Sequence, residues 1–415
     1  MAELIDLKEL EEKVILIAVK TREEDDTEAC LEELAELVET AGGITVGTVI
    51  QNRENVHPGT YLGKGKIDEV KELVWELQAT GVVCDDELSP AQLRNLEDML
   101  ETKVMDRTMV ILDIFASRAN TREGKIQVEL AQLKYRAARL VGLRNSLSRL
   151  GGGIGTRGPG EKKLEMDRRI IHERIGQLKA QLKEVERHRE VQRQQREQTH
   201  TQVAAIVGYT NAGKSTLLNH LTDAGILAED KLFATLDPTT RKLELPSGQQ
   251  ILLTDTVGFI RKLPHHLVEA FKSTLEEACY SDIILHVADV SNPQMDMQMH
   301  TVYETLKQLK VTEKVVVTVF NKMDKMESPV ILKDLSADYQ VKISARTGQG
   351  ISELLEILET ILRSQKVYLE KVYPYQEAGR IQQIRKFGEL ILEEYVEEGI
   401  RVKAYVPATL YGKLV

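Results

Sequence analysis

The feature that most constrains the fold is an apolar run that leads directly into a glycine-containing loop and then a helix. VAAIV (203–207) is followed by GYTNAGKS (208–215), which fits the pattern G-x-x-x-x-G-K-[ST], and then by STLLNHL (215–221). This spacing is typical of a phosphate-binding loop, in which backbone N–H groups and the helix N-terminus surround a β-phosphate. Lys214 would add positive charge across the β- and γ-phosphates, and the Ser215 hydroxyl would coordinate Mg²⁺. The segment predicts a nucleotide site on an α/β sheet.

A second motif follows the next apolar run. ILLT (251–254) leads into DTVG (255–258). At the end of a strand, Asp255 is placed to hold Mg²⁺ through a water, and the Gly258 N–H is placed to meet a γ-phosphate. The spacing from Gly208 makes this short motif specific, so we expect both segments to serve one site.

A third pair of motifs selects the base. NKMD (321–324) ends an apolar run, and SAR (344–346) follows another. An aspartate accepts hydrogen bonds from guanine N1–H and N2, whereas adenine offers neither donor and would leave Asp324 unpaired. Asn321 is expected to bridge loops and reach guanine N7, and the Ala345 N–H to meet guanine O6. Because the carboxyl ends of strands bind ligands in such sheets, the motifs predict GTP rather than ATP.

The segment between the first two motifs, FATLDPTTR (233–241), is the expected switch. A threonine there should bind Mg²⁺ and the γ-phosphate in the GTP state and release them after hydrolysis. Thr235, Thr239 and Thr240 compete for this role, and position alone does not decide between them.

The residue after DTVG is Phe259. Ras-like GTPases carry a glutamine here that orients the attacking water, and phenylalanine cannot do this. Either another group of the chain supplies the function or, as we hypothesise, unassisted hydrolysis is slow and a bound partner accelerates it.

We divide the 415 residues into four segments, since the chain is too long for a single core. Residues 1–117 are predicted to be a small α/β domain, in which GKGK (63–66) is a turn rather than a phosphate site. Residues 118–198 are predicted to be an antiparallel coiled-coil hairpin. Residues 199–364 are predicted to be a GTPase domain with a doubly wound, mostly parallel sheet, and residues 365–415 a small α+β domain.

The first, third and fourth segments each have a distinct pattern of expected elements. In the first, strands are expected at 14–20, 45–50, 82–86 and 103–107, and helices at 25–43, 66–81 and 89–100. In the third, buried strands are expected at 203–208, 251–255, 283–290 and 315–322. In the fourth, a strand at 367–373 and a helix at 380–388 precede a hairpin at 389–407 that turns at Glu398-Gly399.

Heptad spacing identifies the hairpin in the second segment. Apolar residues step by four and three along two stretches, Ile126, Leu130, Leu133, Ala137 and Leu140, then Ile171, Ile175, Leu178, Leu182 and Val185. This pattern is typical of two coiled-coil helices. The residues between the two stretches include LGGGIGTRGPGEKKLE (150–165) at the far end of the hairpin.

The second segment is also basic. The chain carries a formal net charge of −10, yet Lys and Arg outnumber Asp and Glu by about two to one between Arg118 and Arg196. One interpretation is a solvated coiled coil that only spaces two domains. The other is an arm that contacts the backbone of folded RNA without reading bases. The residues expected to make that contact are Gly153, Gly155, Arg157, Gly158, Lys162 and Lys163.

The cysteines and the hydropathy of the sequence indicate the compartment in which the protein is expected to act. The three cysteines, Cys30, Cys84 and Cys279, are widely spaced and form neither a disulfide framework nor a metal cluster. The apolar run VILIAV (14–19) is too short to span a bilayer, and the acidic N-terminus lacks a signal-peptide pattern. We expect a cytoplasmic protein without a membrane span.

Taken together, these motifs resemble the HflX-type family of ribosome-associated GTPases, and the resemblance spans nearly the whole chain. The residues that carry it are GTRGPGE (155–161), GYTNAGKST (208–216), LFATLDPTTR (232–241), DTVGFI (255–260), NKMD (321–324) and SAR (344–346). The resemblance places the switch threonine at Thr235, so Mg²⁺ is assigned to Ser215 and Thr235, with Thr239 as the fallback. The catalytic set is then Lys214, Thr235, Asp255 and Gly258.

The resemblance also implies the full nucleotide site. Its residues are Gly208, Tyr209, Thr210, Asn211, Ala212, Gly213, Lys214, Ser215, Phe233, Ala234, Thr235, Leu236, Asp237, Asp255, Thr256, Val257, Gly258, Asn321, Lys322, Met323, Asp324, Ser344, Ala345 and Arg346.

The function implied by the resemblance is a ribosomal one. It implies binding to the 50S subunit, with GTP favouring attachment and hydrolysis favouring release, and dissociation or rescue of 70S ribosomes under stress. It also suggests that the glycine-rich tip reaches the peptidyl-transferase region. The protein is expected to be a monomer off the ribosome. The alternatives are a GTP-dependent non-catalytic scaffold or 50S assembly factor, and an RNA-acting ATPase that works through residues 1–117.

Overall fold

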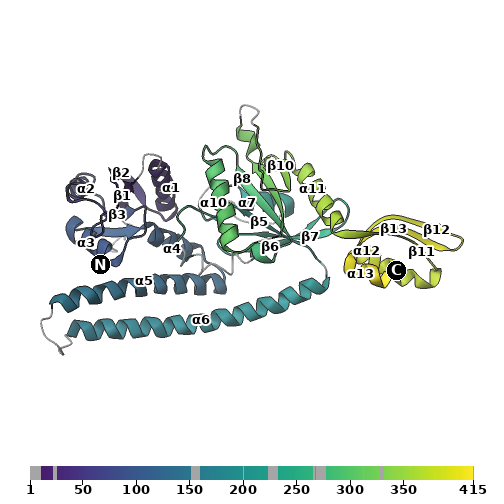
Figure 1. The fold of residues 1–415 in the computed structure, drawn as a ribbon, viewed down its shortest axis with the longest axis horizontal. Helices are drawn as coiled ribbons and strands as arrows, with labels where there is room; N and C mark the ends of the chain where they lie inside the picture. The colour runs from purple at the N-terminus through teal and green to yellow at the C-terminus, as the bar shows by residue number, and fades with distance from the viewer. Residues whose placement is uncertain are drawn as a thin grey trace, which may run out of the picture. The chain divides into compact units, whose positions relative to one another are not determined.

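The structure is a computed structural model that describes residues 11–21, 26–150, 159–199, 201–222, 232–264, 267, 277–311, 313–326 and 331–414. The chain forms two compact units (Figure 1). The first unit contains the chain up to Val185 together with the short segments 231–233 and 261–271, and the second contains the remainder. Within the described residues, no helix is long and apolar enough to cross a membrane.

The first unit contains a four-stranded parallel sheet with the order β2-β1-β3-β4. Its strands are β1 (Lys13–Lys20), β2 (Ile44–Asn52), β3 (Gly81–Cys84) and β4 (Lys103–Asp106). Between them run α1 (Thr27–Thr40), α2 (Lys64–Glu76) and α3 (Pro90–Leu100). Strand β1 is buried along nearly its whole length, as expected for a strand covered on both faces. The predicted α/β fold of this part of the chain is confirmed.

One helix of this domain was not predicted. Helix α4 (Arg107–Arg118) begins directly after β4, and the Asp106 carboxylate caps it by accepting a hydrogen bond from the Met109 N–H at 3.0 Å. Its sequence, RTMVILDIFASR, is rich in β-branched residues that favour strands in isolation. Burial of Ile111, Ile114 and Phe115 stabilises it as a helix.

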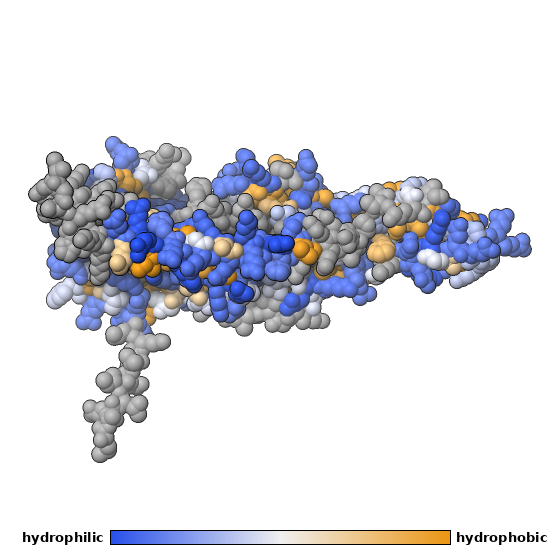
Figure 2. Space-filling view, turned by 90° about the horizontal axis from the view of Figure 1, so that it is seen from below, coloured by the Kyte–Doolittle hydropathy of each residue, from blue (hydrophilic) through white to orange (hydrophobic). Residues whose placement is uncertain are grey.

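The predicted coiled-coil hairpin is present as α5 (Arg122–Leu150) and α6 (Pro159–Thr199), which run antiparallel (Figure 1). Eight of the ten predicted heptad residues, all but Leu140 and Val185, form one apolar seam: Ile126, Leu130, Leu133, Ala137, Ile171, Ile175, Leu178 and Leu182. An ion pair between Arg174 and Glu129 at 2.7 Å joins the two helices beside the seam. The face of the molecule that is drawn in Figure 2 is mostly hydrophilic, with hydrophobic residues scattered over it.

The helices of the hairpin extend well past the heptads. Much of the stretch between the heptads is helical, because α5 continues to Leu150 and α6 already begins at Pro159. Lys162 and Lys163 therefore lie in the first turns of α6 rather than in the loop. The other predicted RNA-contact residues, within 151–158, lie outside the described residues.

The second unit contains a six-stranded sheet with the order β10-β9-β8-β5-β7-β6. Its strands are β5 (Val203–Gly208), β6 (Thr239–Glu244), β7 (Gln250–Asp255), β8 (Ile283–Asp289), β9 (Val315–Asn321) and β10 (Tyr339–Lys342). All neighbours pair in parallel except β6, which is antiparallel to β7. Strand β6 was not predicted, since TTRKLE contains a single buried apolar residue, Leu243.

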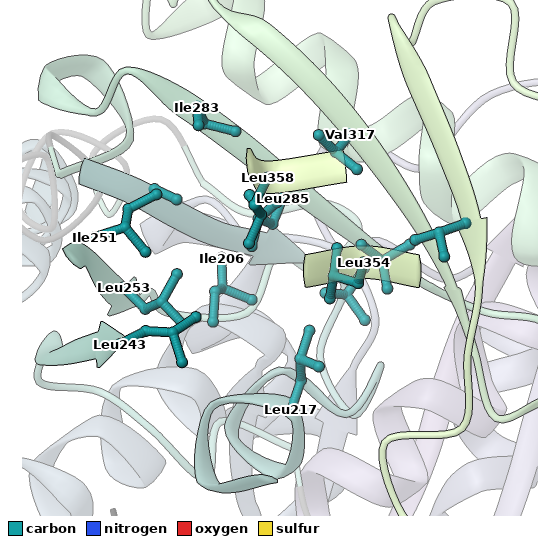
Figure 3. Close-up of a cluster of buried hydrophobic side chains, with 14 of the residues drawn as sticks. Ile206, Leu217, Leu243, Ile251, Leu253, Ile283, Leu285, Val317, Leu354 and Leu358 are labelled. Carbon is teal, nitrogen blue, oxygen red and sulfur yellow. The ribbon is translucent and has the colours of Figure 1, made fainter. Parts of the chain in front are cut away.

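Helices α7 (Lys214–Thr222), α10 (Met295–Gln308) and α11 (Ile351–Ser364) pack on this sheet. Figure 3 shows part of the core, where Leu217 of α7 and Leu354 and Leu358 of α11 lie among sheet residues such as Ile206 and Leu285. Strand order and parallel pairing bring the carboxyl ends of β5, β7, β8, β9 and β10 to one edge. The predicted P-loop GTPase fold is confirmed.

The C-terminal segment forms an antiparallel sheet with the order β11-β13-β12. Its elements are β11 (Lys366–Tyr373), α12 (Ala378–Phe387), β12 (Glu389–Val396), β13 (Gly399–Pro407) and α13 (Ala408–Leu414). Val396 pairs with Gly399, so the hairpin turns where it was predicted to. Tyr373, Ile384 and Val402 lie in its core.

A buried polar cluster lies behind the central strands of the second unit. His286 of β8 is 1% exposed, and its ring makes an edge-on contact with Tyr303 at a centroid distance of 4.9 Å. Tyr303 and Thr318 both donate hydrogen bonds to the Asp334 carboxylate at 2.6 Å. Burial lowers the pKa of His286 to about 4.

This cluster predicts a loss of stability in mild acid. The pKa of His286 is lower in the folded than in the unfolded protein, so between the two values the unfolded state binds more protons and is favoured as pH falls. We expect the free energy of unfolding to fall by about 1 kcal/mol more between pH 7.5 and 5.5 in the wild type than in His286→Leu. Urea denaturation at each pH measures this, with the exposed His172→Gln as the control. An equal pH dependence in His286→Leu and the wild type would refute the assignment.

Candidate nucleotide-binding site

The loop between β5 and α7 has a backbone conformation that only some amino-acid types can adopt. Gly213 has φ +91, and a Cβ atom there would lie 2.3 Å from the Asn321 Nδ2 atom. Asn211 is also left-handed, with φ 59, a conformation that asparagine adopts more readily than most residues. The spacing of the motif therefore corresponds to a definite loop shape whose N–H groups precede the first turn of α7.

Lys214 lies within this loop. Its ammonium group is buried and donates a hydrogen bond to the Tyr209 carbonyl at 2.7 Å. Burial lowers the pKa of Lys214 to about 8, and the nearby Asp255 carboxylate opposes this shift. The side chain thus arches back over the loop and retains its positive charge at neutral pH.

Three oxygen-bearing side chains meet at the start of α7. The Ser215 hydroxyl donates a hydrogen bond to Asp255 Oδ2 at 2.7 Å, and its oxygen lies 2.8 Å from Thr235 Oγ1. Burial raises the pKa of Asp255, whose Oδ1 atom is buried without a hydrogen-bond partner among the described residues. Two hydroxyls and an unsatisfied carboxylate oxygen are the hard donors that Mg²⁺ prefers, so these residues fit that ion.

The three competing threonines are separated by their positions in the fold. Thr235 reaches Ser215, as described above. Thr239 and Thr240 instead belong to strand β6, where Thr239 pairs with Asp255 in the ladder and the Thr240 hydroxyl lies 2.9 Å from that of Thr254. The geometry therefore favours Thr235 over Thr239 as the switch threonine.

The DTVG segment lies directly against the phosphate loop. The Phe259 N–H donates to the Gly208 carbonyl at 3.1 Å, and the Thr210 N–H donates to the Phe259 carbonyl at 2.8 Å. A Cβ atom at Gly258 would lie 3.0 Å from Lys214 Nζ and 2.8 Å from Thr210 Cγ2. The ring of Phe259 is 1% exposed. The chain thus passes the lysine closely at Gly258, where a side chain would interfere.

The two base motifs are joined to the phosphate loop by one side chain. The Asn321 amide donates to the Ala212 carbonyl at 2.9 Å and accepts from the Ala345 N–H at 2.9 Å. Ser344 donates to Asp324 Oδ1 at 2.6 Å, and this bond lowers the pKa of Asp324. Asn321 therefore bridges the loops as expected. The Ala345 N–H, however, is already bonded to Asn321 rather than open toward a base.

Two residues of the predicted set have partners that sequence reasoning missed. Lys322 is left-handed, with φ 65, and forms an ion pair with Asp289 at 2.6 Å. Asp289 ends the apolar strand β8, and that strand-end position was the available signal. Phe233, which we assigned to the nucleotide site, instead packs its ring on Phe115 of α4 at a centroid distance of 4.7 Å. Both aromatic residues belong to the first unit.

Comparison with known proteins decides the family. A curated GTPase HflX of Lacrimispora saccharolytica is 74% identical over 414 residues, which cover 100% of this chain and 98% of the relative. The chain belongs to the HflX family of GTPases. HflX relatives from Caldanaerobacter subterraneus subsp. tengcongensis (50% identical, 97% of this chain and 93% of the relative) and Escherichia coli (42% identical, 95% and 93%) agree.

Family models describe successive parts of this HflX-family chain. A GTP-binding GTPase N-terminal model matches residues 28–116, a GTP-binding GTPase middle-region model matches 118–196, and a 50S ribosome-binding GTPase model matches 203–322. Among solved structures, the crystal structure of the SsGBP and GDP complex covers 84% of this chain and 98% of its own, with 24% identity and a TM-score of 0.46. A GTP-binding protein from Sulfolobus solfataricus in complex with GDP covers the same shares, with 23% identity and a TM-score of 0.44.

The bridging role of Asn321 predicts a stability effect without any ligand. Asn321→Ala removes the bond to Ala212 and leaves the buried Ala345 N–H without that acceptor, so we expect the free energy of unfolding to fall by about 1–3 kcal/mol. Denaturant titration of the nucleotide-free protein measures this. Asn52→Ala, at an exposed position at the end of β2, is the matched control. If both variants unfold alike, the bridge does not contribute to stability.

Proposed function

We propose that this chain binds GTP and Mg²⁺ at the carboxyl edge of the six-stranded sheet and hydrolyses GTP to GDP and phosphate. The observation that carries the proposal is the meeting of Ser215, Thr235 and Asp255, at 2.7 and 2.8 Å, beside a buried lysine. These contacts bring the phosphate loop and the proposed Mg²⁺ donors together, and Asn321 joins the base loops to them. Family membership supports the same activity.

Each residue then has a defined role. Lys214 would neutralise charge on the β- and γ-phosphates, and the Gly258 N–H would meet the γ-phosphate. Ser215 and Thr235 would hold Mg²⁺, with Asp255 bound through a water, and the ion would neutralise phosphate charge. Asp324 would accept hydrogen bonds from guanine, with its carboxylate oriented by Ser344. These roles use the side chains in the orientations described above.

Phe259 bears on the rate of hydrolysis. Its ring is buried and has no atom that can accept a hydrogen bond from an attacking water. We propose that hydrolysis by the free protein is slow and that a bound partner supplies or positions the missing group. The same observation favours a second candidate function, a GTP-dependent scaffold or 50S assembly factor with negligible turnover.

The proposed partner is the 50S ribosomal subunit, with GTP favouring binding and hydrolysis favouring release, in the dissociation or rescue of 70S ribosomes under stress. The match of residues 203–322 to a 50S ribosome-binding GTPase model supports this. So does the basic hairpin, on which Arg169, Lys179, Lys183 and Arg187 are exposed along α6. Such side chains suit phosphate contacts with RNA.

We further propose the domain division 1–117, 118–198, 199–364 and 365–415, which the ranges of the three family models support. The protein is proposed to act in the cytoplasm and to be a monomer off the ribosome. Its cysteines are free thiols, two of them buried, as suits a reducing compartment.

Single-turnover hydrolysis of GTP, alone and with purified 50S subunits, tests the proposal. We expect 50S subunits to raise the rate constant at least about tenfold, which corresponds to a barrier lower by about 1.4 kcal/mol. Deletion of residues 151–160 should leave GTP affinity intact and remove most of this stimulation, because it removes the proposed RNA contact. Lys66→Ala, a substitution on α2, is the control. No stimulation of the wild type would favour the scaffold, and full stimulation of the deletion variant would refute the role of the tip.

A further inference from the structure

A second cluster of carboxylates lies in the first unit, at the carboxyl edge of the parallel sheet. Asp85 and Asp86 follow β3, and Asp106 ends β4, where it pairs with Cys84 in the ladder. Asp85 and Asp106 are both 0% exposed. Because a buried carboxylate requires cations or hydrogen-bond donors, the partners of these two residues identify the elements that depend on them.

Asp106 fixes helix α5 of the hairpin to this edge. Its carboxylate accepts hydrogen bonds from the Tyr135 hydroxyl at 2.6 Å and from the Arg139 guanidinium at 2.5 Å. It also accepts from the N–H groups of Leu88 at 3.2 Å and Met109 at 3.0 Å. Tyr135 and Arg139 of α5 are therefore bonded directly to the carboxylate that caps α4.

Asp85 continues the network to another segment. Arg107, the residue after Asp106, donates to Asp85 Oδ1 at 2.8 Å, and it is paired with Glu33 as well. The ammonium group of Lys262 donates to Asp85 Oδ2 at 2.5 Å and to Asp86 Oδ1 at 2.7 Å. Ion pairs thus connect helix α5 to Lys262 through two adjacent residues, Asp106 and Arg107.

Lys262 lies only four residues after Gly258 in the chain. Its φ of 51 is left-handed, which is unfavourable for a lysine and persists where contacts over-determine the backbone. Phe233, two residues before Thr235, is left-handed as well, with φ 53, and its ring is held by Phe115. Both chain segments that border the proposed nucleotide loops therefore carry a strained, non-glycine residue whose side chain is anchored in the first unit.

We propose that Lys262 is a positioning residue that couples the nucleotide state to helix α5 through its ion pairs with Asp85 and Asp86. The inference rests on the proposed function in one respect, that the DTVG segment responds to the γ-phosphate. When that segment shifts, Lys262 and its strained backbone shift with it, and the ion pair of Lys262 with Asp85 is weakened. By linkage, a ligand of α5 that disturbs Asp106 and Arg107 changes nucleotide affinity by the same factor as the nucleotide changes the affinity of that ligand. The conformation of helix α5 and the affinity of the nucleotide site thereby depend on each other.

The test uses the full-length protein without ribosomes. Hydrogen–deuterium exchange of amides in α5 around Tyr135 and Arg139 is compared with GDP bound and with a non-hydrolysable GTP analogue bound. We expect the wild-type exchange rates in the two states to differ by about fivefold or more. Lys262→Met should abolish this difference while GDP still binds. Lys307→Met, which removes an exposed ion pair on α10, should retain the wild-type difference.

A second variant tests the other end of the network. Arg139→Met should also abolish the nucleotide-dependent difference near Tyr135, although Lys262 and its partners are unchanged. Persistence of the wild-type difference in Lys262→Met, or equal exchange in both nucleotide states of the wild type, would overturn the proposal. Nucleotide affinity and 50S-stimulated hydrolysis are measured separately, so the coupling can fail while the proposed function holds.

Discussion

The site depends on a buried amide at the end of β9. Asn321 is 2% exposed, donates to the phosphate loop at Ala212 and accepts from the base loop at Ala345. A side chain in place of the Gly213 hydrogen would collide with this amide. Loops that are more than a hundred residues apart in the chain are thereby locked into one arrangement. The cost of leaving either backbone group unpaired keeps them there.

Parallel strand pairing makes that arrangement possible. Since β5, β7, β9 and β10 run in the same direction, their carboxyl ends present the four motif loops at one edge. Asp255 at the end of β7 can then reach Ser215 at the start of α7, and Gly258 can pass close to Lys214. Desolvation of these charged groups strengthens their electrostatic interactions with a bound phosphate or metal ion.

Much of this site and fold could be predicted from the sequence, because strand-end motifs and heptads depend on short spacing rules. The convergence of Ser215 and Asp255 follows from sheet topology. Other features required tertiary information. Helix α4 has strand-like composition, and the polar strand β6 forms because β7 pairs with it. The contact of Phe233 with Phe115 and the ion pair of Lys262 with Asp85 join distant segments, and no local pattern indicates them.

Base selectivity tests the central claim most directly, that this edge forms one guanine-nucleotide site. Isothermal titration calorimetry with Mg²⁺ compares GDP, ADP and xanthosine diphosphate on the wild type and on Asp324→Asn. We predict that the wild type binds GDP at least about a hundredfold more tightly than ADP. The asparagine variant should bind GDP more weakly and xanthosine diphosphate more tightly than the wild type does. Its amide N–H can donate to the carbonyl that xanthine carries in place of the N2 amine of guanine. Equal binding of GDP and ADP by the wild type would contradict the account.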